Sequence, residues 1–148
     1  MENKYFTPNI EDMCIGYEYE IFQKGKPYDP NVMHFMPQPE EDTWIKMIYP
    51  DAFLGYNLKR MFEIYQIRVP YLTKEQIEAE RWEEMNAPIM SIGYGFLYIP
   101  FLKNNCRLDY NYTTNILNIK KDDVTNLYYG ECKDINTFRL IQKLLGIK

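Results

Sequence analysis

Residues 106–129 read CRLDYNYTTNILNIKKDDVTNLYY, and their pattern gives the clearest indication of the fold. Apolar and polar residues alternate over residues 106–112, which is the period of a half-buried β-strand. Apolar runs at residues 116–119 and 124–129 enclose a charged Lys-Lys-Asp-Asp turn, so they predict a β-hairpin. Together with the sequence on either side, they predict consecutive antiparallel strands, a β-meander, over residues 89–133.

Helical signals surround this meander. Asp134 is a good N-cap and Gly146 a good stop, and the apolar residues between them form one predicted buried stripe: Ile135, Phe138, Ile141, Leu144 and Leu145. Thr73 and Gln76 have the spacing of a capping box, which predicts a helix running to about Asn86. A third helix is expected over residues 51–65.

The first half of the chain adds strands and one long loop. Tyr17, Tyr19 and Ile21 alternate with glutamates, which predicts a strand over residues 15–22. Residues 44–49 form a second candidate. Residues 67–72 read as a short edge strand because they contain a proline. Several prolines predict an exposed loop over residues 24–42.

Together these elements predict one fold class. The chain has 148 residues, a length that suits one ordinary domain, and it contains no internal repeat. We therefore expect a single α+β domain over residues 1–148. Its mostly antiparallel β-meander sheet is packed with about three α-helices, one of them at the C-terminus.

Composition narrows the classes of protein. The net charge of −4 disfavours binding to a nucleic-acid polymer, and no apolar run approaches the ~18 residues that span a bilayer. Residues 1–12 have no signal-peptide character, so we expect a cytoplasmic location and no membrane partner. The three cysteines, Cys14, Cys106 and Cys132, fit reduced thiols better than disulfides or zinc ligands.

The aromatic content is high, with 14 Tyr, 8 Phe and 2 Trp. Tyrosine has a large apolar body and a polar tip, so it suits half-buried strands. It also suits contact surfaces between proteins. The composition therefore allows either amphipathic strands or a Tyr-rich binding surface.

Signals of catalysis are weak. The only serine, Ser91, lacks the context of a nucleophile elbow, and the only histidine is His34. His34 precedes the acidic residues 40–42, a pattern that could bind a cation but is more often a solvated loop. We expect no metal site, no cofactor and no enzymatic activity.

One enzyme pattern stays open as an alternative. Glu131-Cys132-Lys133 resembles the Asp…Glu-x-Lys pattern of Mg²⁺-dependent restriction-type nucleases, with Asp109 or Asp123 as the second carboxylate. The other interpretation is the exit of a strand, with Lys133 solvated.

A candidate ligand site comes from cationic and aromatic residues near Thr73. Arg68, Tyr71, Lys74, Arg81 and Trp82 could gather at the predicted helix N-terminus, whose free amides favour anions. Such a set suits a phosphate-bearing ligand whose base stacks on an aromatic ring. The other interpretation is separate surface charges and core aromatic residues.

Three stretches carry a family resemblance: IEDMCIGYE at residues 10–18, IRVPYLTKEQIEAERW at residues 67–82 and YYGECKDINTFRLIQKLLGI at residues 128–147. Together they resemble a group of small uncharacterised proteins encoded by phages and prophages of gut anaerobic bacteria. The resemblance covers most of the chain except the loop at residues 24–42. It implies a small phage accessory protein that works inside a host cell, and it assigns no functional residue.

These observations favour a binding protein without catalysis that modulates the host. It would counter a defence system by sequestering a small anionic nucleotide signal. One alternative is an inhibitor that masks a host protein through a Tyr-rich surface. A virion or assembly component and the Mg²⁺ nuclease are the others. The open edges of a meander also make a homodimer plausible.

Overall fold

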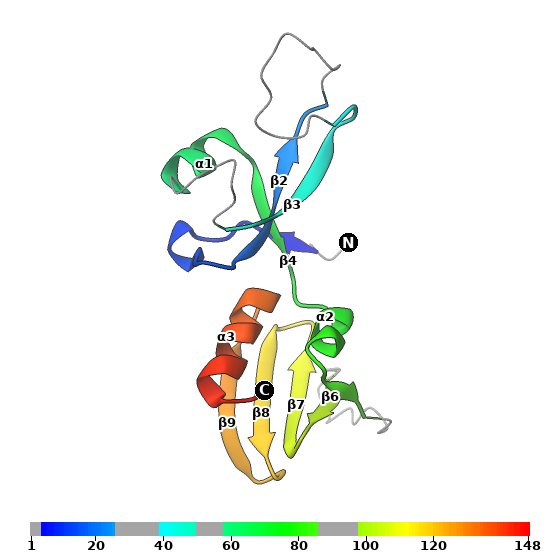
Figure 1. The fold of residues 1–148 in the computed structure, drawn as a ribbon. Coiled ribbons are helices and arrows are strands. Elements are labelled where there is room, and N and C mark those ends of the chain that lie inside the picture. The colour runs from blue at the N-terminus through cyan, green and yellow to red at the C-terminus, as the bar shows by residue number, and fades with distance from the viewer. Residues whose placement is uncertain (1–3, 26–38, 50–57, 86–97) are drawn as a thin grey trace. The chain divides into compact units, whose positions relative to one another are not determined.

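The computed structural model describes residues 4–25, 39–49, 58–85 and 98–148 of the chain (Figure 1). The chain divides into two compact units, residues 1–70 and 71–148, each with its own antiparallel sheet. The predicted α+β class is confirmed, as are the three helices and the helix at the C-terminus. The single domain over residues 1–148 stays a prediction, because compact units of this size can also be halves of one domain.

The first unit contains a four-stranded sheet in the order β1-β4-β2-β3. Its elements are β1 (Tyr5–Phe6), the 3-10 helix η1 (Ile10–Asp12), β2 (Glu18–Gln23), β3 (Thr43–Ile48), α1 (Leu58–Ile64) and β4 (Ile67–Pro70). The prediction that β4 is an edge strand is wrong, because β4 pairs with β1 on one side and β2 on the other. Pro70 is tolerated because it lies at the strand end, where it loses little hydrogen bonding.

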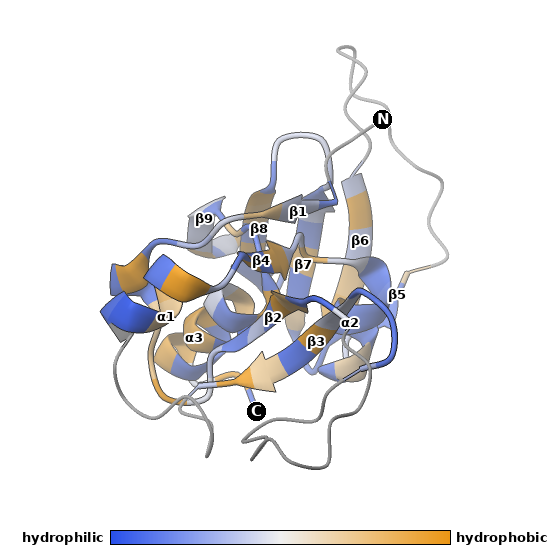
Figure 2. Cartoon of the chain, turned by 90° about the horizontal axis from the view of Figure 1, so that it is seen from above, coloured by the Kyte–Doolittle hydropathy of each residue, from blue (hydrophilic) through white to orange (hydrophobic). Residues whose placement is uncertain are grey.

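Alternation along these strands separates two faces. One face packs into a core together with Met61 of α1 and Met13 after η1; its buried strand residues are Tyr19, Ile21, Ile67 and Val69. Figure 2 shows the same alternation as hydrophilic and hydrophobic bands along β3. The residues between the core positions point to the second face of the sheet.

The second unit contains the predicted meander, with the sheet order β5-β6-β7-β8-β9. Its elements are α2 (Lys74–Ala79), β5 (Glu83–Glu84), β6 (Tyr98–Lys103), β7 (Cys106–Asn111), β8 (Ile116–Lys121), β9 (Thr125–Glu131) and α3 (Ile135–Leu145). Strands β6 to β9 pair with their neighbours in sequence because short turns join them. Asn104 between β6 and β7, Asn115 between β7 and β8, and Asp122 and Asp123 between β8 and β9 have positive φ angles, which asparagine and aspartate tolerate.

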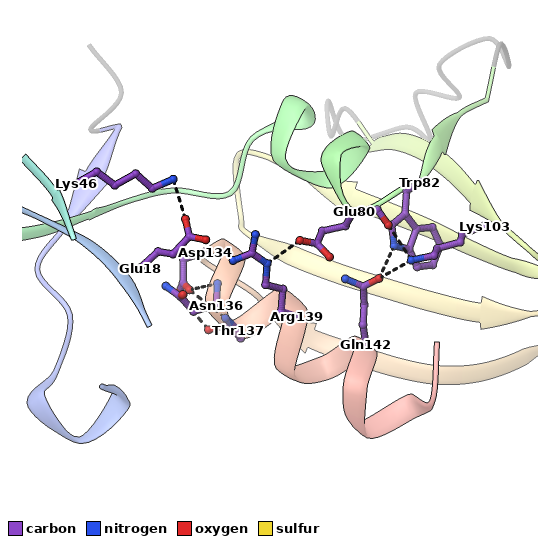
Figure 3. Close-up of polar contacts among 10 residues, drawn as sticks. All are labelled: Glu18, Lys46, Glu80, Trp82, Lys103, Asp134, Asn136, Thr137, Arg139 and Gln142. Carbon is purple, nitrogen blue, oxygen red and sulfur yellow. Dashed lines mark hydrogen bonds and ion pairs between the residues drawn. The ribbon is translucent and has the colours of Figure 1, made fainter. Parts of the chain in front are cut away.

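The C-terminal helix α3 begins and ends as predicted. The Asp134 carboxylate accepts hydrogen bonds from the backbone N–H groups of Asn136 and Thr137 (Figure 3), and Gly146 ends the helix with a φ of 69°. The predicted buried stripe is wrong at Leu144, which is 75% exposed. Gln142 is buried instead.

The helix expected from Thr73 to about Asn86 is shorter than predicted. Its capping box is present, with the Thr73 hydroxyl and the Gln76 side chain each accepting a backbone hydrogen bond, but α2 ends at Ala79. Arg81 then takes a φ of 65°, and residues 83–84 pair with β6. Local helix propensity has therefore been overridden by strand pairing, a non-local contact.

β9 is a long edge strand with one unusual contact. The Cys132 N–H donates to the Asn115 carbonyl at 2.8 Å. Because bonded pairs alternate along an antiparallel ladder, the Glu131 carbonyl points away from β8. The Tyr128 hydroxyl donates to that carbonyl at 2.9 Å, and the end of its ring lies over Gly130, where a Cβ would be 2.9 Å from the hydroxyl oxygen.

Other expectations have mixed outcomes. The strand predicted over residues 15–22 begins only at Glu18, because Ile15 lies in a turn and is 82% exposed. Parts of the predicted loop over residues 24–42, helix over residues 51–65 and strand from residue 89 lie outside the described residues, as do Ser91 and His34. In the described part of the chain, no helix is both long and apolar enough to cross a membrane.

Candidate functional site

The five residues of the predicted ligand site fall in both units. Arg68 lies on β4 of the first unit, whereas the others lie at the start of the second: Tyr71, Lys74, Arg81 and Trp82. Each unit places its residues in a separate setting, and the gathering of all five around one ligand stays a prediction.

Trp82 is a core residue of the second unit. It is 1% exposed, its ring packs 6.2 Å from that of Phe138, and its indole N–H donates to the Gln142 side-chain oxygen at 2.8 Å (Figure 3). The same oxygen accepts from the Lys103 ammonium at 3.3 Å, and burial lowers the pKa of that ammonium. The buried ring has no exposed face to offer a ligand, which matches the interpretation as a core aromatic residue.

Lys74 has acidic partners within its own unit. Its ammonium contacts the carboxylates of Glu84 and Glu78, and the hydrogen bond to Glu84 raises its pKa. Arg81 is exposed at the left-handed turn after α2, and Tyr71 is half-buried. The acidic partners offset the charge of Lys74, so this stretch has less attraction for an anion than the sequence suggested.

Arg68 has the most distinctive surroundings of the five. Its guanidinium carbon lies 3.6 Å from the centroid of the Tyr5 ring and 3.8 Å from that of the Trp44 ring. Its Nε donates to a Glu20 carboxylate oxygen at 2.7 Å. Both side chains of this ion pair are about a quarter exposed, 24% for Arg68 and 22% for Glu20. We call Tyr5, Glu20, Trp44 and Arg68 the Arg68 cluster.

Strand register explains why two rings reach one guanidinium. Tyr5 on β1 pairs with Pro70, two residues along β4 from Arg68. Arg68 pairs with Glu20, whereas Trp44 on β3 pairs with Phe22, two residues along β2 in the opposite direction. The rings therefore approach the guanidinium from opposite directions along the strands. The four side chains of the cluster share the second face because their positions alternate with the core residues.

The Arg68 guanidinium has a fork of terminal nitrogens that the hydrogen bond to Glu20 does not use. Within the described ranges, its only hydrogen bond is the one from Nε to Glu20, so its two terminal Nη groups have no protein acceptor. Flanking rings and a fixed Nε hold the guanidinium in one orientation, which limits the entropy lost when a ligand binds. Such a fork suits bidentate contact with a phosphate or a carboxylate.

Further charges and rings border the cluster. Lys46 on β3 pairs with Glu18 at 2.8 Å (Figure 3), on the same face of the sheet. The Phe22 ring packs 5.3 Å from the Trp44 ring, and Tyr5 is 38% exposed. The face thus combines two cations, two carboxylates and three aromatic rings.

Sequence reasoning found Arg68 but missed its partners. It placed Glu20 on the polar side of a strand and Trp44 at the start of another, and both placements are confirmed. Tyr5 gave no signal. The missing information was the register between strands far apart in sequence, which alternation within one strand does not specify.

The nuclease pattern at Glu131 has a simple ionic arrangement. The Lys133 ammonium pairs with the Glu131 carboxylate at 3.1 Å, whereas Asp109 accepts from Arg107 Nε at 2.9 Å on β7. Among the residues that the structure describes, no group of three or more His, Cys, Asp or Glu side chains could hold a metal ion. The nuclease alternative gains no support from this arrangement.

No protein-family model matches the chain, and no curated protein or solved structure matches it either.

Proposed function

We propose that the protein is a phage accessory protein that binds, without catalysis, a small anionic nucleotide in the cytoplasm of a bacterial host. Sequestering such a signal would counter a host defence. The observation that carries this proposal is the Arg68 guanidinium, held between two aromatic rings and with no acceptor for either Nη group among the residues that the structure describes.

The cluster matches the two parts of a nucleotide. A phosphate would take the Nη edge of Arg68 in a bidentate contact, which is the strong form of anion recognition. The base would find aromatic surface beside it, since Tyr5 is 38% exposed and Trp44 is half-buried. Stacking of a base on an aromatic ring contributes about 1–3 kcal/mol.

The charge of the face favours a small ligand over a polymer. Arg68 and Lys46 are each paired with a glutamate, so the face has no excess of positive charge. Nucleic-acid polymers are bound through several unbalanced cations along the backbone. A ligand with a single anionic contact needs only one free fork.

One observation favours a second candidate, the masking of a host protein. Tyr129 on β9 is 70% exposed and Val124, just before this strand, is 84% exposed. Tyrosine is enriched at protein interfaces. This surface lies in the second unit, so its variants can be tested apart from the Arg68 cluster.

The test is isothermal titration with adenosine and guanosine 5′-monophosphates and their 3′,5′-cyclic forms. For any nucleotide that binds, Arg68→Ala should weaken affinity roughly ten- to a hundredfold, because a hydrogen bond to a charged group contributes ~1.5–3 kcal/mol. Arg68→Lys should lose nearly as much, since an ammonium lacks the planar fork.

Arg107→Ala is the matched control. Arg107 also lies on a strand and also donates from Nε to a carboxylate, and no aromatic ring within the described ranges faces its guanidinium. It should leave nucleotide affinity unchanged. If no nucleotide binds, or if both alanine variants weaken binding equally, the proposal is wrong.

A further inference from the structure

Glu20 lies beside the proposed anion position. Its carboxylate accepts from Arg68 Nε at 2.7 Å, and it faces Arg68 on β4 and Lys46 on β3 across the sheet. Lys46 turns to Glu18, so the nearest contact of the Glu20 carboxylate is with the same guanidinium that would bind a ligand. One cation is therefore shared between a fixed carboxylate and any incoming anion.

This sharing limits the charge that a ligand can bring. An anion on the Nη edge of Arg68 lies across one guanidinium from Glu20, which is 22% exposed and therefore only partly screened. A second negative charge ~6 Å from a carboxylate lowers affinity about threefold even with the full screening of water, and more in a half-buried site. The first charge is offset by Arg68, but the second has no partner in the cluster.

We infer that the Arg68 cluster selects a nucleotide phosphodiester, with one negative charge, over a terminal phosphate with nearly two. The inference rests on the proposed function and names the ligand class of the same site. Glu20 is the specificity-determining residue, because it sets the charge that Arg68 can still accept.

The experiment compares two ligands that differ in charge and little else. One is adenosine 5′-monophosphate, which carries nearly two charges above the second phosphate pKa of about 6. The other is its methyl ester, a phosphodiester with one charge; the guanosine pair is measured alongside. Titrations at pH 7.5 give the ratio of the two dissociation constants for the wild type and for Glu20→Gln.

The wild type should bind the methyl ester at least about threefold more tightly than the monophosphate. Glu20→Gln keeps an oxygen acceptor for Arg68 Nε and removes the charge, so the ratio should fall towards one. Asp109→Asn makes the same change beside Arg107 and should leave the ratio unchanged. Thermal melting of each variant verifies that it is folded.

The outcomes separate the two proposals. If the monophosphate binds as tightly as its ester, or if Glu20→Gln leaves the ratio unchanged, charge selection is overturned while nucleotide binding stands. If the wild type binds neither ligand of either pair, the proposed function fails and this inference fails with it.

Discussion

Two arginine–carboxylate pairs, one in each unit, have the same chemistry in different surroundings. In the first unit Arg68 donates to Glu20 across two strands, and aromatic rings lie within 4 Å of its guanidinium. In the second unit Arg107 donates to Asp109 on its own strand, with Asp123 3.9 Å from a terminal nitrogen. Arg107 is thus surrounded by carboxylates, whereas Arg68 keeps its terminal nitrogens free of protein acceptors in the described structure.

The difference extends to how each unit uses its aromatic residues. In the second unit Trp82, Phe101 and Phe138 are core residues that each expose 1% or less of their surface, although Tyr129 is 70% exposed. The first unit keeps Tyr5 and Trp44 on the second face of its sheet, around a cation. An aromatic residue contributes most to stability when it is buried, so partly exposed rings around a charge are better suited to binding than to folding.

The two tryptophans give the largest expected contrast. Trp82→Ala should lower the free energy of unfolding by about 3–5 kcal/mol, because it leaves a cavity and removes the indole N–H that donates to the buried Gln142 oxygen. Trp44→Ala should cost about 1–2 kcal/mol, since its ring is only half-buried. Urea unfolding followed by circular dichroism measures both values. Equal losses would remove the distinction between a folding ring and a binding ring.

The cysteines extend the contrast to pH. Burial raises the pKa of the Cys132 thiol above its ordinary value of 9.0, so above this pH the unfolded state loses a proton that the folded state keeps. The unfolded state then binds fewer protons, so this group lowers stability by about 1 kcal/mol between pH 9 and 10, and the slope approaches about 1.4 kcal/mol per pH unit at higher pH. Cys132→Ala should remove this contribution to the pH dependence of stability, which corresponds to a difference of about one bound proton between the folded and unfolded states.

Thiol reagents provide the companion measurement for the cysteines. Cys14 is exposed and should react in the folded protein, whereas buried Cys132 should react only after unfolding. An unchanged alkaline slope in Cys132→Ala, or rapid labelling of Cys132 in the native state, would contradict the contrast.

The two arginines give the smallest expected difference in stability. Arg68→Ala removes an ion pair and two cation–π contacts, so it should cost roughly 1 kcal/mol. Arg107→Ala removes a more exposed ion pair and should cost less than about 0.5 kcal/mol. Chemical denaturation of both variants should show that the difference between their losses of stability persists in 1 M salt. If high salt abolishes it, the rings contribute nothing to holding Arg68.

Local patterns predicted most of the fold. The hairpin formed by β8 and β9, the capping box at Thr73 and the cap at Asp134 all depend on residues close together in the sequence. The predicted length of the helix after Thr73 is wrong, because pairing of residues 83–84 with the distant strand β6 overrode helix propensity. The burial of Gln142 could not be predicted either, because the hydrogen bond that its side-chain oxygen accepts comes from Trp82, 60 residues away.

The candidate site was harder to predict for the same reason. Its residues come from four strands, and Arg68 lies 48 residues from its partner Glu20. The sequence picked Arg68 but linked it to neighbours along the chain, such as Tyr71 and Trp82. Only the register between distant strands joins it to Tyr5 and Trp44.

Gly130 has a consequence for solubility, although it contributes no side chain. A methyl group there would displace the Tyr128 ring, and the Glu131 carbonyl would lose its hydroxyl donor. An edge strand with unpaired backbone groups can pair with a strand of another chain and so promote aggregation. We expect Gly130→Ala to fold and then to form larger species at high concentration in light scattering, with Tyr128→Phe showing the same behaviour. The protein's resistance to aggregation would then depend on Gly130 in the edge strand β9.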